Sequence, residues 1–433
     1  MSEIDGSHDR FVQSELPNGL SVLVKEAHAA PVASFWLWYR VGSRNEHVGT
    51  TGISHWVEHM LFKGTPGFPK GVAEKAIARE GGVFNGATSY DFTTYYATLP
   101  ASRIALALRI EADRMTGAAF DPQEVAAERT VVISERQGSE NHPEFLLGEE
   151  VRGAALRVHP YGHPTIGHMC DLESITQGQL YDHYRTYYVP NNAVAVAVGD
   201  FDADEMLAQV AEHYGDIPTS GPVPAVTAVE PPQRGERRVV VRREGLVPYL
   251  QVAFRAPGAR EPRFFALAVL NAILTGASAM TFQGGGLTNK SCRLYRALVA
   301  EQLVVNISGS LLPTVDPYLY FLAATVRPER TPQEVEEALE GEITHVIDGD
   351  VTQREVDKAI KQAKAQFAYS SESVTGQALW LGFSEIFADH GWAESYLDNL
   401  SAVTVQDVRA VAEEVLIPGN RTVGWYVPTR GAA

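Results

Sequence analysis

Hydrophobic and polar positions follow the same succession in two parts of the chain. Each part opens with runs rich in Val, Leu and aromatic residues, which are typical of strands. These runs cover residues 20–26 and 31–41 in the first part and 237–243 and 247–256 in the second. A segment with helical character follows each pair of runs, over residues 51–64 and 264–276.

Later segments continue this mixture. Further strands are predicted within residues 83–99 and 318–326, and long helices over residues 102–115 and 122–138. Such a mixture is typical of an α+β protein in which helices cover β-sheets.

An internal repeat supports the division into two parts. Residues 174–199 and 402–427 both read as a helix, a turn with Pro and Asn, and a Val-rich strand. At a constant offset of 228 residues, three pairs are identical: Thr176 with Thr404, Pro190 with Pro418, and Asn192 with Asn420. Because the order of elements repeats along with these residues, we predict two similar tandem halves.

The stretch between the halves, residues 216–238, is rich in Pro and Gly and lacks apolar periodicity, as linkers do. We therefore place the first half at residues 1–215, the linker at 216–236 and the second half at 237–433. The predicted fold class is α+β, and each half is a mostly antiparallel β-sheet covered by α-helices.

Composition narrows the classes of function. The chain is 45% apolar and has a net charge of −17, whereas a nucleic-acid-binding surface needs an excess of basic residues. Two cysteines, Cys170 and Cys292, do not make a disulfide framework in a chain of this size. The first residues lack the features of a signal peptide, and no apolar run approaches the ~18 residues of a membrane helix. We expect a cytoplasmic protein that binds neither nucleic acid nor membrane.

The helical segment 51–64 carries a candidate metal motif, HWVEH at residues 55–59. Residues four apart share a helix face, so His55 and His59 can bind the same ion. Glu58 lies near that face and can reach a water molecule on the metal. The order of the motif reverses H-E-x-x-H, and the reversed form also occurs in zinc peptidases.

A pair of histidines at this spacing also occurs on ordinary helices, where both side chains are satisfied within the core. Here the motif lies among apolar residues, Ile53, Trp56 and Val57, so the helix reads as buried. Burying polar groups without partners costs on the order of several kcal/mol, and a zinc ion would satisfy them. We therefore favour a metal site.

A third protein ligand is needed if water is to occupy the fourth position of a zinc site. The segment AERTVVISERQ supplies Glu128 and Glu135, which are seven residues apart and share a helix face. Either carboxylate can reach the metal, and spacing alone does not choose between them. The alternative is a charged helix face with no metal role.

Five segments in this order resemble the pitrilysin/insulinase family of metallopeptidases, in particular its bacterial and mitochondrial processing-peptidase-like branch. The segments are GTTGISHWVEHMLFKGT, NGATSYDFTTYY, AAERTVVISE, HPYGHPTIG and YYVPNNAVAVAVGDF. In that family a glutamate about 76 residues after H-x-x-E-H completes the zinc site, and from His59 this count reaches Glu135. The resemblance implies that Glu135 is the third ligand and that Glu128 orients the site.

The resemblance also implies a mechanism and a substrate class. One zinc ion per chain acidifies its water, and Glu58 takes the water's proton and passes it to the leaving amine. Asn85 matches a family position on an edge strand, where extended peptides bind by strand addition. The alternative for Asn85 is a turn or bulge residue. We expect an endopeptidase that cleaves peptides or unfolded segments within a clam-shell chamber.

The second half lacks the motif. When the two helices are aligned, Leu267, Leu270 and Asn271 stand opposite His55, Glu58 and His59. We therefore expect the first half to be catalytic and the second half to be a non-catalytic wall of the chamber.

Active relatives bring an arginine and a tyrosine from the second half to the substrate. In the matching stretch, residues 293–308, Val299 and Val305 occupy these positions, and Arg293 and Arg296 are out of register. Losing an oxyanion donor can cost about 10²–10³ in rate. We therefore expect a heterodimer with a homologous subunit that carries the Arg/Tyr pair, or otherwise a homodimer.

Two further functions are alternatives. Relatives that lack the zinc motif serve as non-catalytic structural subunits of larger complexes. A lyase of the S-ribosylhomocysteinase kind also carries H-x-x-E-H, with a cysteine ligand that would be Cys170. The histidines of the loop VHPYGHPTIGHMC are expected to pack rather than bind metal, and the GGG run at 284–286 lacks the lysine of a nucleotide-binding loop.

Overall fold

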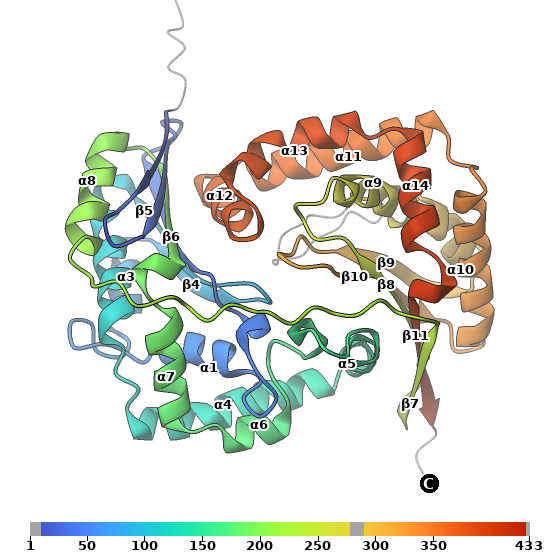
Figure 1. Ribbon diagram of the computed structural model, residues 1–433, viewed down its shortest axis with the longest axis horizontal. Helices are drawn as coiled ribbons and strands as arrows, with labels where there is room; N and C mark the ends of the chain where they lie inside the picture. Colours follow the sequence, from blue (N-terminus) through green and yellow to red (C-terminus); the bar gives the residue numbers. More distant parts are fainter. Residues whose placement is uncertain (1–9, 278–289, 430–433) are drawn as a thin grey trace, which may run out of the picture. The chain divides into compact units, whose positions relative to one another are not determined.

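The computed structural model describes residues 10–277 and 290–429, so the GGG run at 284–286 lies outside the described residues. It contains two β-sheets, one from each half of the chain, and Figure 1 shows helices on both. The predicted fold class is therefore confirmed as two tandem halves, each a mixed sheet covered by helices.

The first sheet has six strands in the order β1-β2-β6-β3-β5-β4. Their bounds are β1 Phe11–Glu15, β2 Ser21–Glu26, β3 Val32–Tyr39, β4 Val83–Thr88, β5 Thr93–Pro100 and β6 Ala193–Gly199. Neighbouring strands are antiparallel, except that β2 and β6 are parallel. The run 83–99 folds as a hairpin of β4 and β5, which leaves β4 at the edge of the sheet.

The second sheet has five strands in the order β7-β11-β8-β10-β9. Their bounds are β7 Arg237–Glu244, β8 Tyr249–Ala256, β9 Val304–Leu311, β10 Tyr318–Val326 and β11 Arg421–Thr429. One pair, β7 with β11, is parallel and the others are antiparallel. Position by position, this order and these directions repeat the arrangement β2-β6-β3-β5-β4 of the first sheet.

The repeat at an offset of 228 residues has the same local structure in both halves. Helices α7 (Gln177–Tyr187) and α14 (Val405–Val415) each begin with a capping box, in which Thr176 and Thr404 bond reciprocally to the residue three positions later. A single 3-10 turn follows each helix, and each turn leads into a central strand, β6 or β11.

The remaining helices are divided between two compact units. In the first half they are α1 Ile53–Met60, α2 Val72–Arg79, α3 Ala105–Gly117, α4 Pro122–Glu140, α5 Pro143–Ala155, α6 Met169–Ser174 and α8 Ala203–Tyr214. In the second half they are α9 Arg263–Thr275, α10 Pro332–Ile347, α11 Gln353–Ser370, α12 Val374–Phe387 and α13 His390–Ala402. None of the helices in the described ranges is long and apolar enough to span a membrane.

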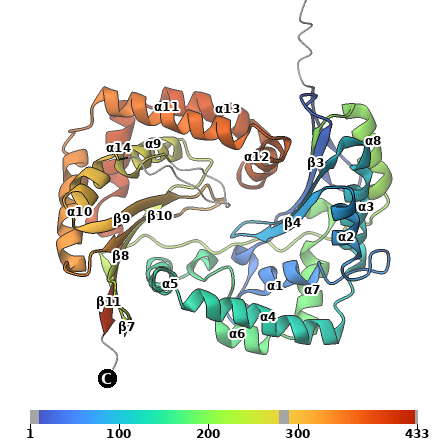
Figure 2. The same cartoon turned by 180° about the vertical axis from the view of Figure 1, so that it is seen from behind.

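Each unit contains one helix from the other half of the sequence. The first unit consists of Met1–Ser134, Thr165–Val226 and Ser371–His390, and the second of Glu135–Pro164, Thr227–Ser370 and Gly391–Ala433. Helix α12 thereby packs on β3 and β6, whereas α5 packs on β7, β8 and β11 (Figure 2). The boundaries predicted for the two halves, at residues 215 and 237, remain a prediction.

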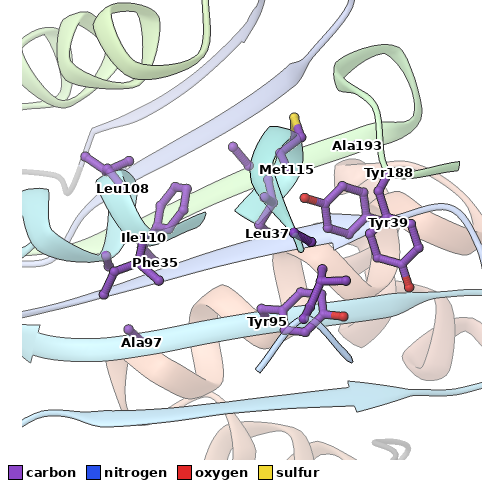
Figure 3. Packing of buried hydrophobic residues seen from close by; sticks show 14 of the residues in the cluster. Phe35, Leu37, Tyr39, Tyr95, Ala97, Leu108, Ile110, Met115, Tyr188 and Ala193 are labelled. Atoms are coloured by element: carbon purple, nitrogen blue, oxygen red, sulfur yellow. The ribbon is translucent and has the colours of Figure 1, made fainter. Parts of the chain in front are cut away.

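The core of the first unit explains why β3 reads as a continuous apolar run. Phe35, Leu37 and Tyr39 point to one face of the sheet, where Leu108 and Ile110 of α3 lie beside Phe35, and Tyr188 lies beside Tyr39 (Figure 3). Trp36 and Trp38 point to the other face. All five strand residues have 0% exposure, because helices cover both faces of the strand.

The segment between Tyr214 and Arg237, where the linker is predicted, contains neither helix nor strand. One of its side chains is nevertheless fixed within the second unit. The carboxylate of Glu230 accepts hydrogen bonds from the backbone N–H groups of Arg157, Val158 and His159 at 2.7–3.0 Å. These bonds hold the pKa of Glu230 below its usual value, although burial alone would raise it.

Candidate metal centre

Helix α1 is held at its N-terminus by two buried carboxylates. Glu46 accepts hydrogen bonds from the backbone N–H groups of Gly52 and Ser54, at 2.8 and 2.9 Å. Asp171 accepts from the hydroxyl and the N–H of Thr51, at 2.6 and 3.0 Å. Gly52 has a φ of +87°, and an added Cβ would lie 2.5 Å from the carbonyl oxygen of Ile166, so only glycine fits there. These contacts fix where the helix starts.

The inner face of α1 is packed against the core and carries one polar side chain, Ser54, which makes two contacts. Trp56, Val57 and Met60 have 0% exposure. Ser54 Oγ donates to the carbonyl oxygen of Gly42, and it lies 3.1 Å from Nε2 of the buried His183. Burial lowers the pKa of His183 to about 3, so its ring is neutral at pH 7. The helix therefore cannot rotate without losing apolar burial and these bonds.

The outer face of α1 brings His55 and His59 together with Glu135 of α4. One ligand atom from each of the three residues lies within 4.8 Å of the other two, and the imidazole centroids are 4.6 Å apart. Among the residues that the structure describes, this is the one group of three or more candidate ligands. The two histidines are partly buried and Glu135 is exposed. Three side chains predicted from the sequence thus meet at one point.

The chemistry of this donor set fits a zinc ion. Two imidazole nitrogens and one carboxylate oxygen are the ligands of a common class of catalytic zinc site, which leaves a fourth position open. Burial, with a smaller contribution from neighbouring His59, lowers the pKa of His55 to about 3. The imidazole of His55 is therefore neutral at pH 7, as a metal ligand must be.

The structure separates Glu128 from Glu135, which spacing alone left equivalent. Glu128 is buried, and its Oε1 lies 2.8 Å from Nδ1 of His59. Because a carboxylate only accepts, Nδ1 carries the proton and Nε2 of His59 is left with a lone pair for a metal. The other oxygen of Glu128 pairs with the ammonium group of Lys63. Glu128 therefore contacts a candidate ligand and lies outside the group of three.

Glu58 points toward the edge of the first sheet. Its Oε2 accepts a hydrogen bond of 2.7 Å from the hydroxyl of Thr88, the last residue of β4. The rings of Phe62 and Phe84 pack edge to face at 5.6 Å and join the end of α1 to the same strand. The candidate base and the edge strand are therefore neighbours.

Asn85 lies in the middle of β4 in regular register opposite Tyr96, so the alternative of a turn or bulge residue is wrong. The Asn85 side chain is exposed, and its Oδ1 accepts from the backbone N–H of Gly86 at 2.9 Å. Among the described strands, β4 pairs only with β5. Its outer edge is consequently available for pairing with an extended chain.

The equivalent helix of the second half, α9, is a core helix. Leu267 and Leu270 have 0% exposure, and Asn271 accepts hydrogen bonds from the hydroxyls of Tyr320 and Thr275 at 3.1 and 2.9 Å. No metal-binding group involves it within the described ranges. Apolar packing has taken the place of the metal ligands in this half.

In the stretch 293–308, Arg293 is engaged within the second unit. Arg293 is buried and forms two hydrogen bonds with the carboxylate of Glu355, at 2.8 and 2.9 Å. Val305 lies on β9 and is 58% exposed.

Cys170, the ligand expected for a lyase, is not in the group of three candidate ligands. Nε2 of His159 lies 3.1 Å from Oδ2 of Asp316, in agreement with the expected packing role of its loop.

Sequence reasoning missed four residues that shape this site: Glu46, Lys63, Thr88 and Asp171. Lys63 and Thr88 stand within the segments HWVEHMLFKGT and NGATS, but their partners lie 65 and 30 residues away. Nothing in local spacing indicates such long-range contacts.

Comparisons with known proteins match both halves of the chain. Residues 21–168 match the family model described as Insulinase (Peptidase family M16), and residues 174–363 match Peptidase M16 inactive domain. An uncharacterized zinc protease of Mycobacterium tuberculosis is 29% identical over 413 residues, which cover 93% of this chain and 90% of the relative.

Two solved structures have the same fold. The crystal structure of a protease from Helicobacter pylori matches with a TM-score of 0.91 at 25% identity, and covers 97% of this chain and 100% of that chain. The periplasmic protease PqqL from Escherichia coli matches with a TM-score of 0.75 at 19% identity, over 97% of this chain but 48% of that chain. Since models of the same family match both halves, the chain belongs to the M16 (insulinase) family of peptidases.

Proposed function

We propose that the protein is a zinc-dependent endopeptidase. The observation that carries this proposal is the convergence of His55, His59 and Glu135, with ligand atoms within 4.8 Å of one another. Glu58, the acid of the H-x-x-E-H motif, follows on the same helix. The relative of Mycobacterium tuberculosis, named as a zinc protease, supports the same chemistry.

His55, His59 and Glu135 would hold one zinc ion. When bound, zinc polarises a scissile carbonyl group and makes a water molecule more acidic. Glu58 acts as the general base, which takes a proton from the attacking water and delivers it to the leaving amine. The hydroxyl group of Thr88 donates to Oε2 of Glu58 and orients this carboxylate. Glu128 supports the site by bonding Nδ1 of His59.

Extended peptides or unfolded segments are the proposed substrates. A peptide that adds to the open edge of β4 would form backbone hydrogen bonds beside Asn85. Thr88, at the end of the same strand, holds the general base. Because backbone pairing is largely independent of side chains, this mode of binding favours broad specificity.

A second M16 chain is the proposed partner. The side chains of Val299 and Val305 cannot donate hydrogen bonds to an oxyanion, and Arg293 is engaged by Glu355. The chain also spans about half of PqqL, which is long enough to hold two such chains in tandem. We propose a heterodimer in which a homologous subunit supplies the Arg/Tyr pair, and otherwise a homodimer.

The test combines zinc content with cleavage of quenched peptides. The zinc-loaded chain is assayed beside Glu58→Gln, His55→Ala and Glu135→Ala. We expect Glu58→Gln to retain zinc and lose cleavage, and both ligand variants to lose zinc. A folded wild-type chain that binds no zinc would refute the proposal. If the zinc-loaded chain cleaves only after a homologous Arg/Tyr-bearing subunit is added, the heterodimer is supported.

A non-catalytic structural subunit is the second candidate. The match of residues 174–363 to the inactive domain of the family, together with the apolar helix α9, favours it. This candidate predicts no cleavage in any pairing, even with zinc bound, whereas the peptidase predicts cleavage that Glu58→Gln abolishes.

A further inference from the structure

Lys63 forms an ion pair with Glu128 that plays no part in the reaction proposed above. It lies three residues beyond the end of α1, and its ammonium group pairs with Oε2 of Glu128. Glu128 bonds Nδ1 of His59 through its other oxygen, at 2.8 Å. Lys63, Glu128 and His59 thus form a continuous chain that ends at a candidate zinc ligand.

The environment makes this chain rigid. The side chain of Glu128 is 6% exposed and that of Lys63 is 21% exposed, so water has little access to the carboxylate. A buried carboxylate needs a partner for each oxygen, because an unsatisfied charge in the interior is costly. A carboxylate held at both oxygens also cannot turn about its terminal bond, whereas one held at a single oxygen can.

We propose that Lys63 is a positioning residue for the metal site and acts through Glu128. It holds the carboxylate in the orientation that keeps Nδ1 of His59 bonded and directs Nε2 toward the zinc ion. This inference rests on the proposed zinc site. Loss of such an outer contact typically weakens metal binding 10–100-fold, and since Glu128 itself remains, we expect about tenfold.

The chain offers a matched control in the ion pair of Lys70 and Glu124. Glu124 lies one helical turn before Glu128 on α4, and Lys70 Nζ is 2.6 Å from its carboxylate. This pair also joins the segment after α1 to α4. Its side chains are 56% and 29% exposed, and the described contacts of Glu124 do not include a candidate zinc ligand. Exposed ion pairs of this kind contribute little to the stability of a protein.

The experiment measures the zinc dissociation constant of the full chain by competition with a chromophoric chelator at fixed pH. Lys63→Met should weaken zinc binding about tenfold, and Lys63→Arg, which keeps the charge, should stay within about threefold of wild type. Lys70→Met should leave the constant unchanged. Thermal unfolding of each metal-free variant checks that it is folded. If Lys63→Met does not fold, Lys63→Arg is the variant that is compared with wild type.

A double-mutant cycle tests the route of the effect. In the Glu128→Gln background, Lys63→Met should cause no further loss of zinc affinity. An equal tenfold loss in that background, or an unchanged constant for Lys63→Met in the wild-type background, would overturn the inference. A wild-type chain that binds no zinc would instead refute the metal site itself, and the inference with it.

Discussion

The side-chain amides of Asn192 and Asn420, 228 residues apart, make the same pair of hydrogen bonds. Asn192 donates to the carbonyl oxygens of Tyr187 and Arg40 at 2.9 and 3.4 Å. Asn420 donates to those of Val415 and Arg255 at 2.9 and 3.0 Å. In each half, the asparagine ties the end of one helix to the central strands of the sheet.

Replacing these asparagines should destabilise both units. Asn192→Ala leaves the buried carbonyl group of Tyr187 and the partly buried carbonyl group of Arg40 without this donor, and we expect a loss of about 1–3 kcal/mol in the free energy of unfolding. Asn420 is less buried, so Asn420→Ala should cost less. Chemical denaturation of the metal-free variants measures both. A larger loss for Asn420→Ala would contradict the assumed dependence on burial.

Thr88 should affect catalysis without affecting zinc binding. Thr88→Val keeps the shape of the side chain and removes the hydroxyl group that holds Oε2 of Glu58. We expect kcat to fall about tenfold, with KM and zinc content unchanged. This loss is part of the roughly 10²–10⁴-fold rate acceleration that a positioned base contributes. Thr88→Ser should restore most of the activity. Equal losses in the two variants would show that packing, rather than the hydroxyl group, matters.

His183 should make the first unit sensitive to acid. Burial, with a smaller contribution from His47, lowers its pKa to about 3, against 6.5 for an ordinary histidine. Between these two values the unfolded chain binds more protons than the folded one, so stability falls as pH falls below 6.5. The free energy of unfolding of wild type should drop relative to His183→Gln by about 1.4 kcal/mol per pH unit below pH 6. Parallel pH profiles of the two proteins between pH 7 and pH 4.5 would argue against this assignment.

Two helical glycines should respond in opposite ways to alanine. A Cβ at Gly382 of α12 would lie 2.0 Å from Nε1 of Trp38, which has 0% exposure. Gly382→Ala should therefore cost about 1–3 kcal/mol through overpacking. Gly341 lies inside α10 with no heavy atom within 4 Å of an added Cβ, and Gly341→Ala should stabilise the protein by about 1 kcal/mol. Melting temperatures that move in the same direction would contradict this expectation.

Local periodicity was sufficient to predict much of the fold. The strand over residues 318–326 coincides with β10, and the helix over residues 264–276 lies within one residue of α9. The pairing of His55 with His59 also follows from helical spacing. These features depend on the backbone geometry of one element, which a single segment of sequence determines.

Other parts of the site depend on how elements pack, and spacing did not indicate them. Glu128 and Glu135 share a helix face, so the position of α4 along α1 decides which of them joins the histidines. Lys63 and Thr88 have ordinary positions in their own segments and gain a role only from contacts with distant residues. The apolar pattern of a helix such as α12 likewise identifies a buried face without indicating which sheet will cover it.

The placement of α12 also sets the order in which the molecule can be completed as the ribosome makes it. The first sheet has all its strands once β6 ends at Gly199, but α12 ends at Phe387. At typical rates of synthesis this interval lasts roughly 10–40 s. Until then the face of β3 that carries Trp36 and Trp38 lacks α12, the helix that packs on it in the described structure. The first half of the chain therefore exposes this aromatic surface to other proteins in the cell until most of the second half has been translated.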